Sequence, residues 1–519
     1  MKKILLLALG LTLCAEAGAY GILHAASDQP KQGGTLTLAI RRDLLLANPF
    51  VNVRSTQGRI MDLLYDPLLG LDNQGKLQPS LAESWEVSKD GRVVTFKLRK
   101  GIKFHNGQEM TAEDVKFSIN YSRNPKNGAQ GFPELAPVEN VEAPDRYTFK
   151  IFLKGPSPAL LYSLTALRAF PVVPKGSVAE GVDKIPSFPP GTGPFKFVEW
   201  KRQQHLILER YDNFWGPKAY LDRLVMKPIQ EDAVRLTALR AGDVDFVERA
   251  PLEWVKQIAE GKLKGIRYAP AKYAEFEGIE FNVAVPPFNN KKLRLAVTHA
   301  VNKREIFDAA FMGFGELTDQ KYPKGHDWYF EGLPVPSYNP DRARALLKEA
   351  GYRGEVLEFL VQSSLIEQAG AAALQAQLKR IGMNISIRPV DEGDYRSRPR
   401  KGDYTFRFDG GTLYPDPLMA YGELHCEPDL SKRAQNTAGY CNKEMDAWID
   451  RAERNADPEE RRALVRKIVA KALEDIPEIY LGYVPQFYAL RDHVKGFETD
   501  SDANFRWWGG GLSHTWLDK

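Results

Sequence analysis

The sequence predicts a multidomain α/β protein with a strand-rich first third and a second half in which helices alternate with strands. Three observations lead to this prediction: the length of 519 residues, apolar residues at every second position in segments up to about residue 160, and apolar residues at helical spacing later in the chain. A single hydrophobic core stops growing at roughly 250–300 residues, so two or three domains are expected.

The alternating segments are short and are separated by turn signals. Residues 35–40, 94–98 and 147–151 place apolar side chains at every second position, which is typical of a strand with one buried face. Residues 72–75 and 105–107 carry the Asn and Gly residues that favour turns. We therefore expect few helices before residue 160.

Helical faces appear in the second half of the chain. Apolar residues recur at i, i+3, i+4 and i+7 over residues 343–350, and similar faces cover residues 374–381, 445–452 and 465–472. Residues 384–388 alternate as a strand directly after the second of these helices. This alternation of helices with strands predicts helices that cover the faces of a sheet.

The first residues have the pattern of a secretory signal. Two lysines precede the apolar stretch from Ile4 to Leu13, and small residues follow it. Residues 17–19 and the Ala25-Ala26 pair both offer a cleavage site. We expect residues 1–26 to be removed and the mature protein to be periplasmic.

The charge balance and the distribution of apolar residues argue against two classes of protein, nucleic-acid-binding proteins and polytopic membrane proteins. Lys and Arg number 71 against 67 Asp and Glu, which gives a net charge of +4 without long blocks of like charge. This pattern does not suggest a nucleic-acid partner. No run of 18 apolar residues is present, so a polytopic membrane protein is excluded as well.

Two cysteines, Cys426 and Cys441, remain after signal removal. Cysteines in an exported protein most simply pair with each other, so we expect a disulfide between them. The alternative is a metal site that combines Cys426 with His425.

Catalytic motifs are missing from the sequence. It contains no G-x-S-x-G, H-E-x-x-H, Walker A, C-x-x-C or G-x-G-x-x-G segment. A soluble exported chain with many aromatic residues and none of these motifs is expected to be a binding protein and not an enzyme. We expect no cofactor and no resident metal.

A series of segments in one order carries a family resemblance. The segments are Gly33 to Leu36, Tyr65 to Leu68, Pro79 to Trp85, Phe96 to Arg99, Gly101 to Gly107, Thr111 to Val115, Gly191 to Phe195, Asn213 to Gly216 and Asn302 to Ile306. From about Gly33 to its end, the chain resembles the family 5 extracellular solute-binding proteins of ABC importers, the dipeptide, oligopeptide and nickel group. We interpret the shared segments as architecture and not as ligand contacts.

The resemblance implies a periplasmic-binding-protein type II-like fold of three domains. Lobe I would comprise residues 27–72, 186–283 and 489–519, and lobe II would comprise residues 284–488. Residues 73–185 would form an additional β-rich domain. The lobes of such proteins close around a ligand by a hinge motion.

The resemblance also implies a function. The protein would capture a small polar solute, most simply a peptide, and deliver it as a monomer to ABC permease subunits in the inner membrane. Alternatives in the same fold are an opine, a sugar, nickel or a metallophore. A periplasmic enzyme and a chaperone-like protein are alternatives from other classes.

The ligand-binding positions of peptide-binding relatives differ in this chain. Alignment on Asp416-Pro417 places Leu413 where those proteins have the acid that binds the peptide's amino group, and Gly410 where they have a tryptophan. Ser363 stands where dipeptide binders have an arginine for the carboxylate. We therefore expect recognition not to depend on a free amine at position 413, and we expect Asp416 to be structural.

Other residues are candidates for ligand binding. Arg407 and Asp409 share one face of a predicted strand and would replace the missing charges, although a salt-bridged edge strand is the alternative interpretation. Leu413 and Tyr414 are neighbouring candidates. Trp507 and Trp508 would form a wall of the cleft or, alternatively, part of the core.

We expect the mature protein from the periplasm to lack the signal segment and to contain no free thiol. Intact-mass spectrometry, with alkylation before and after reduction, measures both properties. Retention of Met1, or alkylation of Cys426 and Cys441 without reduction, would contradict this expectation.

Overall fold

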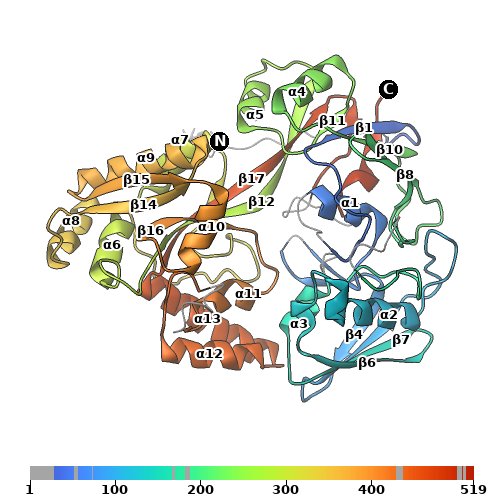
Figure 1. Ribbon diagram of the computed structural model, residues 1–519, viewed down its shortest axis with the longest axis horizontal. Coiled ribbons are helices and arrows are strands. Elements are labelled where there is room, and N and C mark those ends of the chain that lie inside the picture. The colour runs from blue at the N-terminus through green and yellow to red at the C-terminus, as the bar shows by residue number, and fades with distance from the viewer. Residues whose placement is uncertain are drawn as a thin grey trace, which may run out of the picture.

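The fold consists of two lobes joined by a pair of long strands, with a strand-rich unit beside one lobe (Figure 1). The computed structural model describes residues 29–51, 56–72, 74–165, 170–181, 188–427, 436–499, 505–506 and 510–519. The expected signal segment lies outside the described residues, and so do Trp507 and Trp508.

The two long strands are β12 (Ile266–Phe281) and β17 (Glu478–Arg491), which pair antiparallel. In the described part of the chain they stand in the middle of an eleven-stranded sheet with the order β15-β14-β16-β12-β17-β11-β1-β10-β9-β8. The remaining strand of that sheet, β13 (Glu316–Leu317), pairs with β17. One sheet therefore runs through both lobes.

The first lobe is built around β1 (Thr35–Ile40), which lies between two strands parallel to it, β10 (Arg223–Pro228) and β11 (Phe246–Val247). Its other elements are β8 (Phe195–Lys201), β9 (His205–Arg210), α1 (Thr56–Leu64), α4 (Asp232–Ala241) and α5 (Leu252–Ala259). Ile40 packs in the core on the α1 side, and Ala39 packs in the core on the side of α4 and α5. The sequence predicts one buried face for this strand. That prediction is wrong for the carboxyl half of β1, because helices cover both of its faces.

The strand-rich unit contains a four-stranded antiparallel sheet in the order β4-β5-β7-β6. Its elements are β4 (Ala82–Val87), β5 (Val93–Leu98), β6 (Val138–Asp145), β7 (Thr148–Leu153) and the covering helix α2 (Ala112–Arg123). The hairpin β2 (Leu69–Leu71) and β3 (Leu77–Pro79) precedes this sheet, and α3 (Ala159–Ser163) follows it. Val94, Phe96 and Leu98 are buried, which confirms the alternation predicted for residues 94–98.

The second lobe places helices on both sides of its sheet. Its elements are β14 (Val356–Gln362), β15 (Asn384–Val390), β16 (Phe406–Gly411), α6 (Lys291–Ala300), α7 (Lys303–Phe311), α8 (Pro340–Glu349), α9 (Leu365–Arg380), α10 (Glu392–Arg400), α11 (Pro417–Tyr421), α12 (Lys443–Glu453) and α13 (Pro458–Asp475). The four predicted helices are confirmed as parts of α8, α9, α12 and α13. The strand predicted at residues 384–388 is confirmed as part of β15. The domain boundaries expected from the resemblance stay a prediction.

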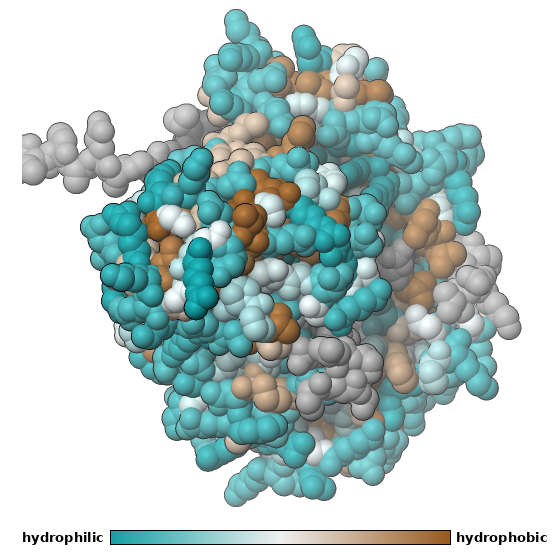
Figure 2. All heavy atoms as spheres, turned by 60° about the vertical axis from the view of Figure 1, so that its left-hand side comes forward, coloured by the Kyte–Doolittle hydropathy of each residue, from teal (hydrophilic) through white to brown (hydrophobic). Residues whose placement is uncertain are grey.

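The surface of the second lobe is largely hydrophilic, with apolar side chains in small separate groups (Figure 2). Among the described helices, none is long and apolar enough to cross a membrane.

Several segments of the family resemblance meet between α1 and the loop before β8. The Asp66 carboxylate accepts hydrogen bonds from Thr192 Oγ1 at 2.9 Å and from Trp215 Nε1 at 2.8 Å. The backbone N–H of Gly193 donates to the carbonyl of Leu64 at 3.0 Å. These contacts hold the end of α1 to the loop before β8 within the first lobe, so the segments are architectural here.

We expect Gly191→Ala to destabilise the protein. A Cβ atom at this position would lie 1.9 Å from the carbonyl oxygen of Leu64, so the backbone has to move. Overpacking of this kind costs about 1–3 kcal/mol. The matched control is Gly155→Ala, because a Cβ atom there has no neighbour within 4 Å. Urea unfolding measures both changes, and equal stability of the two variants would contradict the close approach.

Candidate functional site

In both lobes, the carboxyl ends of the parallel strands lie close to β12 and β17. In the first lobe the chain runs from β10 through α4 to β11, and so passes from one side of β1 to the other. In the second lobe it runs from β15 through α10 to β16, and passes from one side of β14 to the other. Ligands of open α/β sheets bind outside the carboxyl ends of the strands at such reversals of strand order. The two carboxyl edges are therefore the candidate site.

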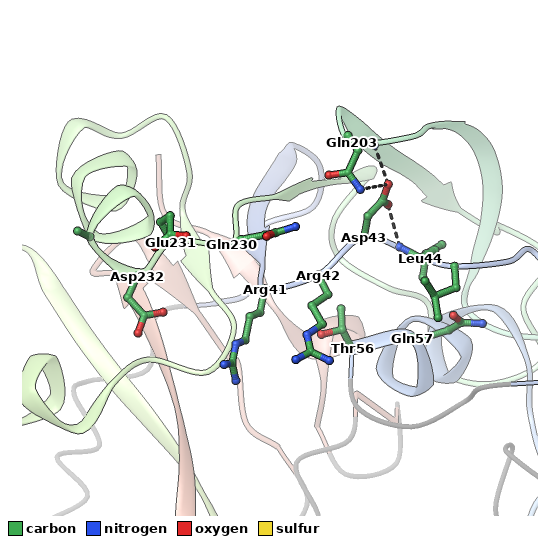
Figure 3. A pocket seen from close by; sticks show the side chains of 12 residues that line it. Arg41, Arg42, Asp43, Leu44, Thr56, Gln57, Gln203, Gln230, Glu231 and Asp232 are labelled. Carbon is green, nitrogen blue, oxygen red and sulfur yellow. Dashed lines mark hydrogen bonds between the residues drawn. The ribbon is translucent and has the colours of Figure 1, made fainter. Parts of the chain in front are cut away.

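A pocket of about 730 Å³ lies at the carboxyl edge of the first lobe (Figure 3). It is lined by residues 41–45, which follow β1, by residues 230–233, which follow β10, by Gln203, and by Thr56 and Gln57 of α1. The pocket thus coincides with the reversal of strand order.

Arg41 and Arg42 supply the positive charge of this pocket. Both are exposed, and among the residues that the structure describes neither guanidinium group has a hydrogen-bond or ion-pair partner. Figure 3 shows the two side chains extending in the same direction, away from Asp43 and Gln203. The two cations are therefore available to an anionic group in the pocket.

The acidic residues of the pocket are largely used by other partners. Asp43 accepts hydrogen bonds from Trp200 Nε1 at 3.0 Å and from the backbone N–H of Gln203 at 2.6 Å. Asp232 forms an ion pair with Arg235 of α4. Glu231 lines the opposite wall (Figure 3). These contacts leave the two arginines without neutralisation by Asp43 or Asp232.

A buried network fixes the backbone from which these arginines extend. Arg59 of α1 pairs with Glu248 at 2.5 Å, and the Thr56 hydroxyl donates to the same carboxylate at 2.8 Å. Arg59 also donates to Gln486 of β17 at 2.8 Å. The backbone N–H of Arg41 donates to Glu248 at 3.4 Å. The network therefore links α1, the ends of β1 and β11, and a crossover strand.

Another ion pair lies where the first lobe meets β12. Arg249, two residues after β11, pairs with Glu275 in the middle of β12. Both side chains are partly exposed. This contact brings the carboxyl edge of the first lobe next to the crossover strands.

The predicted site residues Arg407 and Asp409 lie on β16, Arg407 as its second residue and Asp409 as its fourth, and pair with each other at 2.6 Å. Arg407 Nε also donates to Glu280 at 2.8 Å, and the Tyr404 hydroxyl donates to the same carboxylate at 2.6 Å. The salt bridge that the alternative interpretation predicts is therefore present. Its prediction that this strand lies at the edge of a sheet is wrong. β16 lies between β14 and β12, because the chain returns through α10 and inserts there.

The network around Arg407 continues to Lys321. The Lys321 ammonium lies 2.6 Å from Glu423, 3.0 Å from Glu478 and 4.0 Å from Asp409. The connected side chains comprise two cations and four carboxylates: Lys321, Arg407, Glu280, Asp409, Glu423 and Glu478. Burial raises the pKa of Glu423 and of Glu478, and the nearby Lys321 opposes that shift. The network therefore contains more acidic groups than cations and lies beside the amino-terminal half of β16.

The loop after β16 holds the remaining sequence candidates. Leu413 and Tyr414 are half-buried and pack against the core beside α11, and the Tyr414 carbonyl accepts a hydrogen bond from the Tyr322 hydroxyl at 2.9 Å. Asp416 caps α11 through Leu418 N–H at 2.9 Å and pairs with Arg461 at 2.7 Å. Asp416 is fully buried, which confirms its structural role. A ligand role for Leu413 and Tyr414 stays a prediction.

Each carboxyl edge also has an exposed leucine. Leu45 lines the first-lobe pocket and is 62% exposed, and Leu365 is 87% exposed at the first turn of α9. Ligand sites combine apolar walls with a few polar groups, and these residues are suited to form such walls.

The predicted disulfide is confirmed between Cys426 and Cys441. Since both sulfur atoms are bonded to each other, Cys426 is not available to the alternative metal site. His425 Nε2 lies 3.2 Å from Asp450, and no group of three potential metal ligands occurs among the described residues.

The sequence interpretation missed Arg41 and Arg42. A signal was present, since the two arginines directly follow the first predicted strand. Their significance depends on the parallel pairing of β1 with β10 and β11, which the alternation pattern does not reveal.

Comparison with known proteins identifies the family. Residues 76–427 match the family described as bacterial extracellular solute-binding proteins, family 5 middle. The chain belongs to this family. It is 28% identical over 480 residues to the glutathione-binding protein GsiB of Pectobacterium atrosepticum, which covers 90% of this chain and 92% of that protein.

Two solved structures of family 5 relatives are similar as well. The ABC transporter-associated periplasmic binding protein DppA from Helicobacter pylori, in complex with the peptide STSA, is 27% identical with a TM-score of 0.72. The binding protein AgaA from A. tumefaciens R10, in complex with agropinic acid, is 28% identical with a TM-score of 0.71. Each comparison covers 94% of this chain and 99% of the other. The expected two-lobe fold class is thereby confirmed, and this family 5 protein is the solute-binding component of an ABC importer.

We expect Glu478→Gln to increase stability relative to the unaltered protein as the pH rises. Burial raises the pKa of Glu478 above its ordinary value of 4.5, so the folded state binds the proton more tightly than the unfolded state. The stabilisation from this proton is complete below pH 4.5 and is lost as the pH rises through the folded-state pKa. The free energy of unfolding of the two proteins should diverge by at most about 1.4 kcal/mol per pH unit.

The control for this experiment is Glu474→Gln on α13. Hydrogen bonds from Lys291 and Lys471 lower the pKa of this exposed carboxylate, so its effect should appear at acidic pH and with the opposite sign. Urea unfolding between about pH 4 and 9 measures both trends. Parallel curves for Glu478→Gln and the unaltered protein would contradict the shift.

Proposed function

We propose that this protein captures a short peptide between the carboxyl edges of its two lobes and delivers it to ABC permease subunits. The observation that carries the proposal is the pocket beside Arg41 and Arg42, whose guanidinium groups have no partner among the described residues. In the second lobe, the network around Lys321 and Arg407 contains more acidic groups than cations. A zwitterionic peptide has the complementary charges.

The chemistry of the residues supports this assignment. Arginine binds carboxylates through parallel N–H groups, and the two arginines are suited to a terminal or side-chain carboxylate. Leu45 and Leu365 offer apolar contacts for the rest of the ligand. The similar proteins GsiB and DppA are named for glutathione and for a bound peptide, and glutathione is itself a small peptide.

We propose that closure occurs around β12 and β17, the only elements shared by both lobes in the described sheet. Their pairing has register shifts between Ala271 and Glu275 and between Glu277 and Gly278. Such irregularities interrupt the ladder and are places where a strand bends. The Arg249–Glu275 ion pair lies beside the first of them.

An opine is the second candidate ligand. Gly410 and Leu413 stand where peptide-binding relatives have the tryptophan and the amine-binding acid, and this departure favours a different solute. AgaA, which is solved with agropinic acid, is as similar to this chain as DppA is. An opine also carries carboxylates that suit Arg41 and Arg42.

The compartment and assembly follow from the same proposal. We propose that the chain is exported with removal of residues 1–26, acts in the periplasm as a monomer, catalyses no reaction and binds no nucleic acid. Loss of uptake of the bound solute in a deletion strain would support the transport role, and unchanged uptake would count against it.

We expect the double variant Arg41→Gln/Arg42→Gln to bind peptide carboxylates more weakly. Loss of charge-assisted hydrogen bonds should reduce affinity on the order of 10- to 100-fold. The measurement is calorimetry with STSA and with its carboxyl-terminal amide, and the amide should show little difference between the two proteins. Arg240→Gln, an exposed change outside the pocket lining, is the control. Equal losses for STSA and its amide would contradict a carboxylate role, and agropinic acid in the same assay tests the second candidate.

A further inference from the structure

Glu277 of β12 is a carboxylate without a partner. Among the described residues, no hydrogen bond or ion pair involves its side chain, and it is only half-buried. Its position in the sheet is opposite Gly410 of β16 and opposite Gly482 of β17. Gly410 has no side chain, so the flank of the carboxylate toward β16 is left open, whereas Phe307 and the backbone of Glu316 occupy the space beside Gly482.

Gly410, which leaves the space beside Glu277 open, stands where the peptide-binding relatives have a tryptophan. Both carboxylate oxygens of Glu277 lie 3.8 Å from the position that a Cβ atom at residue 410 would occupy. A tryptophan at 410, as in those relatives, would begin within contact distance of this carboxylate. The absence of that side chain therefore leaves access to an acid that a tryptophan would crowd.

The charged groups near Glu277 do not neutralise it. The acids beside it are Glu275 of β12, Glu367 of α9 and Asp409 of β16. Glu275 pairs with Arg249, Asp409 pairs with Arg407, and Glu367 accepts the backbone N–H of Gln362 at 2.7 Å. Burial and these acids raise the pKa of Glu277. A ligand cation placed there would relieve the repulsion.

We propose that Glu277 receives the cationic amino group of the ligand and thereby takes over, from a strand, the role that Leu413 cannot perform from the loop. The inference rests on the proposed function, because it assumes a ligand between the two carboxyl edges. The inference predicts a ligand that has a free ammonium group at one end and an anionic group that binds Arg41 and Arg42. This changes the expectation from the sequence that recognition does not depend on a free amine.

The test compares many peptide sequences at once, so its result does not depend on which side chains the ligand carries. An equimolar library of tetrapeptides with free and with acetylated amino ends is incubated with the full mature protein, and the retained peptides are quantified by mass spectrometry. We expect the unaltered protein to retain free-amine peptides at least about 10-fold over acetylated ones. Glu277→Gln should bring this ratio close to one, while retention of acetylated peptides stays the same.

Two further variants sharpen the test. Glu277→Asp keeps the charge but withdraws it by one methylene group, so an intermediate ratio is expected. Glu275→Gln removes a neighbouring acid that already pairs with Arg249, and its ratio should stay that of the unaltered protein. Because no hydrogen bond or ion pair of a described residue involves the Glu277 side chain, both of its variants should fold, and circular dichroism checks this.

The outcomes separate the two proposals. Retention of no peptide by the unaltered protein would overturn the proposed peptide function. Equal retention of free and acetylated peptides would overturn the role of Glu277 and leave peptide capture intact. A ratio that falls equally in Glu277→Gln and Glu275→Gln would also overturn the role of Glu277. The combined negative charge of the neighbouring acids would then explain the preference for free-amine peptides.

Discussion

The pairing of β12 with β17 is the constraint on which the rest of this structure depends. These strands belong to one sheet that continues into both lobes, so the hydrogen bonds between them set the position of each lobe's carboxyl edge. β17 is buried along most of its length, β12 is buried where it passes through the second lobe, and their ladder is irregular between the lobes. A continuous sheet with a local interruption holds two rigid bodies together and still lets them rotate.

Among the described residues of the candidate site, paired charged side chains lie in the interior of the protein, and unpaired ones lie at the carboxyl edges of the lobes. Buried charges carry a large desolvation cost unless they are paired, and Arg59, Arg407 and Asp416 all have ionic partners. At the carboxyl edges, by contrast, Arg41, Arg42 and Glu277 have no partner among the residues described. The interior pairs hold the backbone in place, and the unpaired groups lie beside the carboxyl ends of β1 and β16. This distribution is the physical basis for assigning the edges to the ligand.

The sequence predicts much of the fold because the relevant signals are local. Helical faces such as 343–350 depend on short spacings, and the Cys426–Cys441 pair depends on the compartment. The place of β16 inside the sheet and the position of Glu277 opposite two glycines depend on strand register, which no local pattern contains. The alternation pattern indicates Arg407 as a charged strand residue, but its pairing with Glu280 of another strand is visible only in the tertiary structure.

A carboxylate on a crossover strand differs physically from one on a loop. A loop acid such as that of the peptide-binding relatives can adjust its backbone to the ligand, whereas Glu277 is held by ladder pairing on both sides. A group held on a sheet loses less entropy when it binds and tolerates less variation in where the ligand's charge lies. Glu277 also lies next to a register shift of β12, where the strand leaves one lobe for the other. A ligand cation bound there therefore touches the element that moves, so recognition of the amine and closure of the lobes depend on the same few residues of β12.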